Sequence, residues 1–251
     1  MHHYAILGNG RLARHMRHYF SLLNLPCSAW SRDAAPGWNS HDLPDGAKRL
    51  RATVEPASRI LLLVSDTAIP ALLRHYPFLR RRTLIHCSGA LSLPGVAGAH
   101  PLMTFGRELY TLERYREIPF MVDSGENFGR LFPGLQNPHF SIRRDDKASY
   151  HALCVMAGNF AQLLWQAAGS GFGRLGLPAE SLNPYLRQSL QNFLDDPDQA
   201  LTGPLSRGDR YTIERNLAAL SGTPHEAVYR AFIRLHAELR QPNHPIQELA
   251  S

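Results

Sequence analysis

Apolar residues gather in short runs through the first half of the chain. The runs cover residues 4–7, 27–30, 59–65, 83–88, 97–100, 119–123 and 139–143. A continuous apolar run such as "RILLLVS" is typical of a strand that is buried on both faces of a sheet. The stretches between the runs predict helices over 11–23, 67–76 and 125–135, whereas 33–50 is rich in Pro, Gly, Asp and Ser and predicts a loop. Strands that alternate with helices indicate a doubly wound, mostly parallel α/β sheet.

The pattern changes after the last apolar run. Apolar positions recur at helical spacing in one long segment over 145–168, and again in segments that begin at Glu180, Thr212 and Pro224. Asp145 or Asp146 is expected to cap the long helix, because acidic residues suit the positive end of a helix. We therefore predict an α/β domain over residues 1–143 and an all-α domain over 144–251.

The stretch "ILGNGRLARHM" has the spacing of a dinucleotide-binding turn between a strand and a helix. Gly8 allows the tight turn, Gly10 lets the backbone approach a pyrophosphate, and Ala13 lets the helix pack closely. Free N–H groups at the start of the helix favour phosphate. The first domain is thus predicted to be a Rossmann domain, with a cofactor turn made of Gly8, Asn9, Gly10, Arg11 and Leu12. The alternative is a turn without a nucleotide, in which the glycines serve geometry alone.

The end of the second strand indicates which dinucleotide binds. An NAD site has Asp or Glu roughly 20 residues after the glycines, to bind the ribose hydroxyls. Here the corresponding place holds Ser31 and Arg32. A hydroxyl and a guanidinium suit a 2′-phosphate, because Arg donates a forked, charge-assisted pair of hydrogen bonds. We predict NADP (NADPH) over NAD, although Asp33 could turn inward and Arg32 could be a solvated surface residue.

Other strand ends carry candidate binding residues, because ligands of open parallel sheets bind beyond the carboxyl ends of the strands. Val64, Ser65 and Asp66 are expected to line the ribose and nicotinamide, with helix capping as the alternative role of Asp66. Ser88 and Gly89 offer a hydroxyl and open backbone N–H groups to a substrate carboxylate or carbonyl. His86, earlier in the same strand, is expected to face the packing.

Candidate catalytic residues lie at the strand end before Pro101 and on the long helix. His100 could donate a hydrogen bond to a substrate or be a structural histidine. Lys147 and His151 are four residues apart and share a helix face, and Asn159 borders it. His151 is predicted to exchange a proton with the substrate, with Lys147 as second choice and Asn159 orienting the substrate. The alternatives are a solvated Lys147 and helix packing for His151 and Asn159.

The segment "ALTGPLSRGDRYTIERNLAAL" joins a turn-rich loop to a helix. Arg207 is positioned to bind an anion, Thr202 and Gly203 are candidates for the same substrate site, and Asp209 can cap the helix. A purely structural turn is the alternative. Integrin recognition through the "RGD" letters is not expected, because the N-terminus shows no signal peptide.

Composition narrows the function classes. The chain has 251 residues, 44% of them hydrophobic, with a net charge of +6. The basic residues are scattered and not interleaved with aromatics, so we expect an anionic small molecule and not nucleic acid. No apolar run is long enough to span a membrane. Cys27, Cys87 and Cys154 show neither disulfide nor metal-ligand spacing, which predicts buried free thiols, no metal, and a cytoplasmic location.

Taken together, the motifs resemble a family that joins a Rossmann-like domain to a domain of unknown function 2520. The resemblance rests on "ILGNGRLA", "HCSGALS", "AGAHPLMTF", "YHALCVMAGNF" and above all "ALTGPLSRGD". It implies an NADP-dependent oxidoreductase related to β-hydroxyacid dehydrogenases and pyrroline-carboxylate reductase, and a homodimer formed through the helical domain. The family motifs fall on Gly8, Gly10, Ser88, Gly89, His100, His151, Asn159, Thr202, Gly203, Pro204, Arg207 and Asp209. The chain departs from the family at Asn216, where a histidine is common.

Two functions remain open. The first is hydride transfer between NADP(H) and a small hydroxy acid, keto acid or imine bound in the cleft between the domains. The second is a non-catalytic NADP-binding sensor or scaffold. A prephenate-dehydrogenase-like enzyme, suggested by the dipeptide His100–Pro101, is disfavoured by the helical half.

Overall fold

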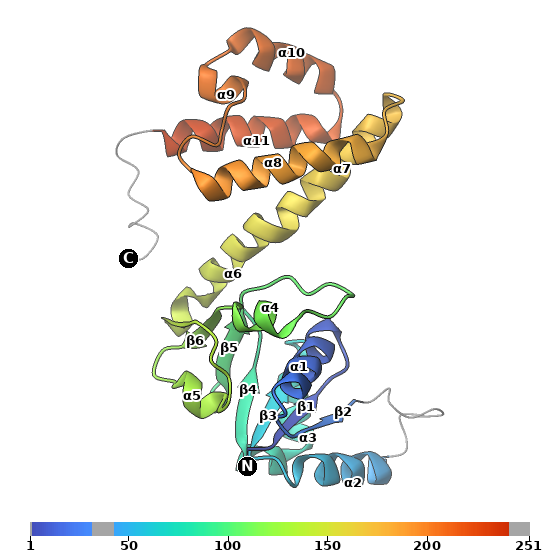
Figure 1. The fold of residues 1–251 in the computed structure, drawn as a ribbon, viewed down its shortest axis with the longest axis vertical. Coiled ribbons are helices and arrows are strands. Elements are labelled where there is room, and N and C mark those ends of the chain that lie inside the picture. The colour runs from blue at the N-terminus through green and yellow to red at the C-terminus, as the bar shows by residue number, and fades with distance from the viewer. Residues whose placement is uncertain (1, 32–42, 241–251) are drawn as a thin grey trace. The chain divides into compact units, whose positions relative to one another are not determined.

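The computed structural model describes residues 2–31 and 43–240 (Figure 1). The chain divides by packing into two compact units, Met1–Ala161 and Gln162–Ser251. The last strand ends at Ile142, close to the domain boundary predicted at 143/144. The packing boundary falls later because the first helical turns after the strand remain attached to the sheet. The division into functional domains stays a prediction.

The first unit contains a seven-stranded sheet in the order β2-β1-β3-β4-β5-β6-β7. The strands are β1 (Tyr4–Leu7), β2 (Cys27–Trp30), β3 (Arg59–Leu62), β4 (Thr83–His86), β5 (Ala97–Pro101), β6 (Phe120–Asp123) and β7 (His139–Ile142). Neighbouring strands are parallel except for the antiparallel pair β5 and β6. The predicted doubly wound, mostly parallel sheet is confirmed.

Strand β1 shows why the apolar runs are continuous. Tyr4 and Ile6 belong to one buried cluster, and Ala5 and Leu7 belong to another on the opposite face of the sheet. Helices α1 (Arg11–Leu22), α4 (Leu112–Arg116) and α5 (Phe128–Leu131) supply the first cluster. Helices α2 (Leu43–Val54) and α3 (Ala68–His75) supply the second. Each fully buried large side chain contributes roughly 1.5–3 kcal/mol, so alternating polar residues would be costly here.

The helices differ from the sequence prediction in two places. Helix α2 occupies much of the segment predicted as a loop, because Ala47, Leu50 and Val54 recur at helical spacing and pack on the sheet. The helix predicted over 125–135 is a single turn, and α4 was not predicted at all. Both short helices begin with a capping side chain, Thr111 for α4 and Asn127 for α5. One turn is too short to show a periodic pattern.

The described chain after β7 contains helices and the loops between them, and no strand. The helices are α6 (Lys147–Val155), a π-helical turn (Met156–Phe160), α7 (Ala161–Arg174), α8 (Leu182–Asp195), α9 (Pro204–Arg207), α10 (Arg210–Leu220) and α11 (Pro224–Leu239). The predicted long helix is confirmed apart from the π turn. Asp146 occupies the predicted N-cap position of α6, but its side chain makes no capping hydrogen bond, and Asp145 and Asp146 form part of a 3₁₀ turn. None of the helices in the described ranges is long and apolar enough to span a membrane.

Candidate functional site

The two glycines of the turn between β1 and α1 differ in their surroundings. The fold requires glycine at position 8, whereas the space beside Gly10 is open. Gly8 has φ +135°, and a Cβ there would lie 2.1 Å from the carbonyl oxygen of Leu63, so the fold itself demands glycine. A Cβ on Gly10 would meet nothing within 4 Å. Gly10 is the N-cap of α1 and offers no capping side chain to the free N–H groups of the first turn. The space beside Gly10 is thus open, and free N–H groups at the start of a helix are of the kind that bind phosphate.

The residues predicted to select NADP are only partly described. Ser31 follows β2 and is 9% exposed. Arg32, on which the recognition of a 2′-phosphate depends, lies outside the described residues, as does Asp33. After β3, Val64 is half-buried, and Ser65 and Asp66 are exposed at the carboxyl end of the strand.

Asp66 and Ser88 connect the loops that follow β3 and β4. The hydroxyl of Ser88 donates to Oδ2 of Asp66 over 2.5 Å and accepts from the backbone N–H groups of Ala90 and Leu91 at 3.2 and 2.9 Å. The N-cap of α3 is Thr67, so Asp66 does not occupy the capping position considered for it. A hydroxyl has one donor and two acceptor sites. The hydroxyl of Ser88 is therefore fully used in shaping its loop.

Two histidines meet at Gly89. The imidazoles of His100, on β5, and His151, on α6, have ring centroids 6.2 Å apart and an interplanar angle of 77°. A Cβ on Gly89 would lie 2.5 Å from Cδ2 of His151 and 3.4 Å from Cδ2 of His100. The absence of a side chain at Gly89 thus lets both imidazoles approach the loop after β4. The fold brings four predicted site residues together here, namely Ser88, Gly89, His100 and His151.

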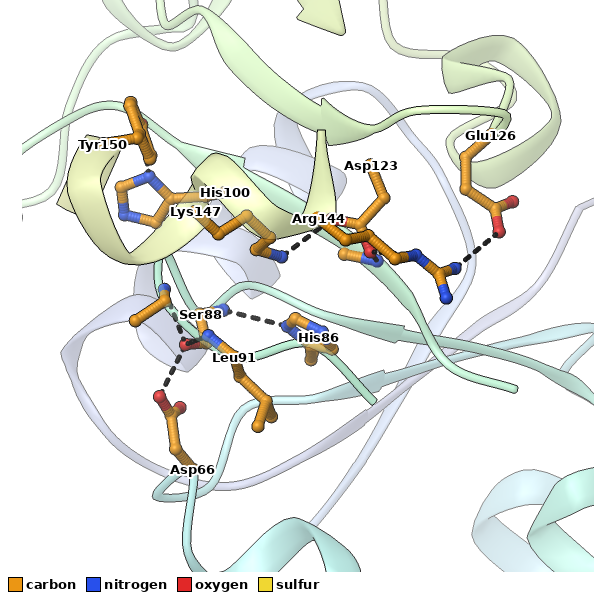
Figure 2. A network of polar contacts seen from close by, with 12 residues as sticks. Asp66, His86, Ser88, Leu91, His100, Asp123, Glu126, Arg144, Lys147 and Tyr150 are labelled. Atoms are coloured by element: carbon orange, nitrogen blue, oxygen red, sulfur yellow. Dashed lines mark hydrogen bonds and ion pairs between the residues drawn. The ribbon is translucent and has the colours of Figure 1, made fainter. Parts of the chain in front are cut away.

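Tyr150 belongs to the same cluster, although the sequence did not predict it as a site residue. Its hydroxyl lies 2.7 Å from Nδ1 of His100 (Figure 2). Burial, together with the neighbouring His151 and Lys147, lowers the pKa of His100 to about 4. Burial also raises the pKa of Tyr150. Near neutral pH both groups are therefore uncharged. The only signal in the sequence was the position of Tyr150, three residues after Lys147 and next to His151.

Lys147 is buried in an ion pair. Its Nζ lies 2.7 Å from Oδ1 of Asp123, and the other carboxylate oxygen of Asp123 accepts from the backbone N–H of Gly98 at 3.0 Å. A Cβ on Gly98 would lie 2.4 Å from both charged groups, so glycine is required there. Figure 2 shows Lys147 reaching from α6 toward Asp123, with Arg144 and Glu126 farther out. The alternative of a solvated Lys147 is wrong, and the ion pair anchors the start of α6 to β6.

His86 and Cys87 directly precede Ser88 in the chain, and both are buried. His86 is 0% exposed, as expected of a residue facing the packing, and its Nδ1 accepts from the backbone N–H of Ser88 at 3.3 Å. Burial and the nearby Lys147 lower the pKa of His86 to about 4. Burial raises the pKa of Cys87 to about 12, so its thiol is a poor nucleophile. All three cysteines are free; Cys87 is buried, and Cys27 and Cys154 are half-buried.

The remaining predicted residues lie elsewhere in the chain. Asn159 is exposed within the π turn, which changes the angle that a regular α-helix would set between it and His151. Thr202, Gly203, Arg207 and Asp209 belong to the second unit. The guanidinium of Arg207 donates to the carbonyl oxygen of Thr202. The carboxylate of Asp209 caps α10, as predicted, by accepting from the N–H of Thr212 at 3.0 Å.

Several solved structures share this fold. One is a protein from Bacteroides fragilis described provisionally as an NADP oxidoreductase, with TM-score 0.73 and 19% identity over 94% of this chain and 97% of that one. A reductive aminase from Aspergillus terreus, solved with NADPH and ethyl levulinate, has TM-score 0.61 and 14% identity over 100% and 98%. Pyrroline carboxylate reductase from Plasmodium falciparum, solved with NADP, has TM-score 0.55 and 12% identity over 95% and 98%.

These likenesses establish the fold of the chain. A search of curated proteins found no match. The family comparison covers α5, β7 and most of the helical part, and agrees with the resemblance seen in the sequence. Residues 125–235 match the model of the family described as domain of unknown function (DUF2520).

Proposed function

We propose that the protein is an NADP-dependent oxidoreductase that reduces or oxidises a small hydroxy acid, keto acid or imine. One observation carries the proposal. The open turn at Gly10 and the histidine pair at Gly89 both lie at the carboxyl edge of the parallel strands β1, β3, β4 and β5. Ligands of open α/β sheets bind at this edge. A phosphate-binding turn, a histidine that exchanges a proton and a second histidine that donates a hydrogen bond, all on one edge, are what hydride transfer needs.

Different residues of the chain exchange the proton, donate a hydrogen bond and contact the substrate. The nicotinamide supplies or accepts the hydride when the cofactor is bound. His151 gives a proton to the carbonyl oxygen or imine nitrogen during reduction and takes it back during oxidation. His100 donates a hydrogen bond to the same atom, and the backbone at Gly89 lies against the substrate. A place for the substrate between the two domains stays a prediction.

The cofactor turn is tested by changing Gly10 alone. Gly10→Asp places a carboxylate where the pyrophosphate would bind, and Asp is also a better N-cap than Gly. We expect the melting temperature of the variant without ligand to be unchanged or higher, while the Kd for NADPH rises at least 100-fold. Calorimetric titration and thermal shift with NADPH and NADH measure both quantities.

Gly10→Asn is the matched control, because Asn caps equally well but carries no charge. A smaller loss of affinity in Gly10→Asn than in Gly10→Asp would identify phosphate repulsion as the cause. Wild-type protein that binds neither NADPH nor NADH would refute the proposal. Tight NADPH binding without turnover of any keto acid, imine or hydroxy acid would favour the sensor function instead.

We also propose that the protein is a homodimer formed through the helical unit. Among the described residues after Ala161, Leu182 alone is buried. Val228, Phe232, Leu235 and Leu239 form an exposed apolar stripe along α11. Such a stripe needs a covering surface, because unburied apolar area leaves a helical unit without a core. A second copy carries the same stripe and can cover it symmetrically.

Light scattering tests the oligomeric state. Wild-type protein is expected at twice the chain mass of 28.1 kDa. Phe232→Glu places a charge in the stripe and is expected to give monomers, whereas Arg234→Glu, at an exposed position of α11 outside the stripe, is expected to leave the dimer intact. A monomeric wild-type protein would rule the dimer out. The free cysteines fit the reducing cytoplasm that we propose as its location.

A further inference from the structure

The contact between Tyr150 and His100 leaves one chemical question open, namely which atom carries the proton. If the hydroxyl donates to a bare Nδ1, then Nε2 of His100 carries the proton and is a hydrogen-bond donor. If Nδ1 carries the proton and donates to the hydroxyl, Nε2 is bare and can only accept. The two tautomers would act on a substrate in opposite ways.

The chemistry of the pair favours the hydroxyl as donor. A phenol, with an ordinary pKa of about 10, is a stronger acid than the N–H of a neutral imidazole, and the bare imidazole nitrogen is the stronger base. The separation of 2.7 Å between the hydroxyl and Nδ1 also matches an O–H donor. N–H donors more commonly lie about 2.9–3.0 Å from an oxygen.

The same molecule contains a second pair of this kind whose tautomer is determined. Nε2 of His15 lies 3.1 Å from the carbonyl oxygen of Gly106, and a carbonyl can only accept, so Nε2 carries the proton. Nδ1 of His15 is then bare, and the hydroxyl of Tyr115 donates to it over 2.8 Å. The hydroxyl of Tyr115 in turn accepts from the backbone N–H of Tyr110. The pair of Tyr150 and His100 shares the contact between a tyrosine hydroxyl and Nδ1 of a histidine, with nearly the same length.

We propose that Tyr150 is a positioning residue that holds the imidazole of His100 in the tautomer whose Nε2 carries the proton. His100 then offers an N–H donor to the oxygen or nitrogen of the substrate. This role toward substrate rests on the proposed oxidoreductase function, but the tautomer itself does not.

The charge state of His100 is consistent with a group that donates a hydrogen bond to the substrate but does not transfer its proton. His151, Lys147 and Asp66 are the charged or titratable groups that act on it electrostatically, and burial outweighs all of them. A pKa of about 4 keeps His100 neutral near pH 7. The neutral imidazole polarises the substrate without giving up its proton, so proton exchange falls to His151.

Nitrogen NMR of protein labelled with ¹⁵N-histidine tests the tautomer. In the wild type, Nε2 of His100 is expected to be protonated and Nδ1 bare, with His100→Asn assigning the signals. His15 is an internal reference for the same tautomer. His139 is a reference for the opposite one, because its Nδ1 lies 3.1 Å from the carbonyl oxygen of Asn137. A protonated Nδ1 on neutral His100 would overturn the proposal.

Tyr150→Phe tests the cause and its consequence. The variant is expected to show a mixture of His100 tautomers and a kcat about tenfold lower, which corresponds to the loss of one hydrogen bond, with the Kd for NADPH unchanged. Tyr185→Phe, on an exposed residue of α8, is the control and should change none of these.

An unchanged His100 signal in folded Tyr150→Phe would overturn the positioning role. A changed tautomer with unchanged kcat would overturn the action of His100 on the substrate. If Tyr150→Phe does not fold, the wild-type spectrum still decides the tautomer. The spectra require no turnover, so a protein that failed to bind NADPH would refute the proposed function and leave this test intact.

Discussion

Replacing Lys147 with methionine is expected to lower the free energy of unfolding by about 3 kcal/mol. The substitution leaves the buried carboxylate of Asp123 without the ammonium 2.7 Å away. Removing one partner of a buried ion pair typically costs about 3–5 kcal/mol, because the other charge stays buried. We expect the lower end of that range because Arg144 lies 3.6 Å from Oδ2 of Asp123 and partly compensates. Urea unfolding followed by circular dichroism measures the change.

Lys48→Met is the matched control, since Lys48 is exposed on α2. Its effect should stay within about 0.5 kcal/mol. The double change Lys147→Met with Asp123→Asn should recover part of the loss, because Asn removes the unpaired charge and can still accept from Gly98. A Lys147→Met variant as stable as Lys48→Met would show that the ion pair does not anchor α6.

Replacing His151 with alanine is expected to lower kcat by about 100-fold to 1,000-fold. Loss of a positioned proton donor typically costs about 10²–10⁴-fold in rate. The Kd for NADPH should stay the same, because the proposed cofactor turn at Gly10 does not include the imidazole. Steady-state kinetics on the substrate found by screening, combined with calorimetric titration of NADPH, separates the two effects.

His75→Ala is the control for this prediction, because His75 is an exposed histidine at the end of α3. It should leave both kcat and NADPH affinity unchanged. A His151→Ala variant that loses NADPH affinity but keeps its kcat would contradict the assignment of His151 as the proton donor and acceptor.

The sequence predicted the strands well and the short helices poorly. Every strand of the sheet was predicted, and the clearest apolar runs, those of β1 and β3, belong to strands whose residues are almost all buried, whereas β7 at the edge of the sheet is largely exposed. Helix α2 was missed because its first half is rich in Pro, Gly and Asp, which favour loops in isolation. Packing of Leu50 and Val54 on the sheet outweighs that local preference.

The glycine turn shows what a motif alone leaves open. Both Gly8 and Gly10 fit the dinucleotide pattern, but the clash of a Cβ with Leu63 gives Gly8 a purely structural reason. Gly10 has no such reason, because a Cβ there would meet nothing within 4 Å, so the proposal of cofactor binding rests on Gly10. The sequence could not make this distinction, because Leu63, which follows β3, is far from Gly8 along the chain.

Local sequence determined the sheet, the glycine turn and the helical half, because hydrophobic periodicity and glycine spacing act between neighbours in the chain. Tertiary structure alone decided the surroundings of the candidate catalytic residues. Lys147 pairs with Asp123 across 24 residues, and Tyr150 bonds His100 across 50. The type of each residue suggested several roles, from solvated charge to proton donor. The burial and the hydrogen-bond partner of each residue, which exist only in the folded chain, determine which of those roles the residue can have.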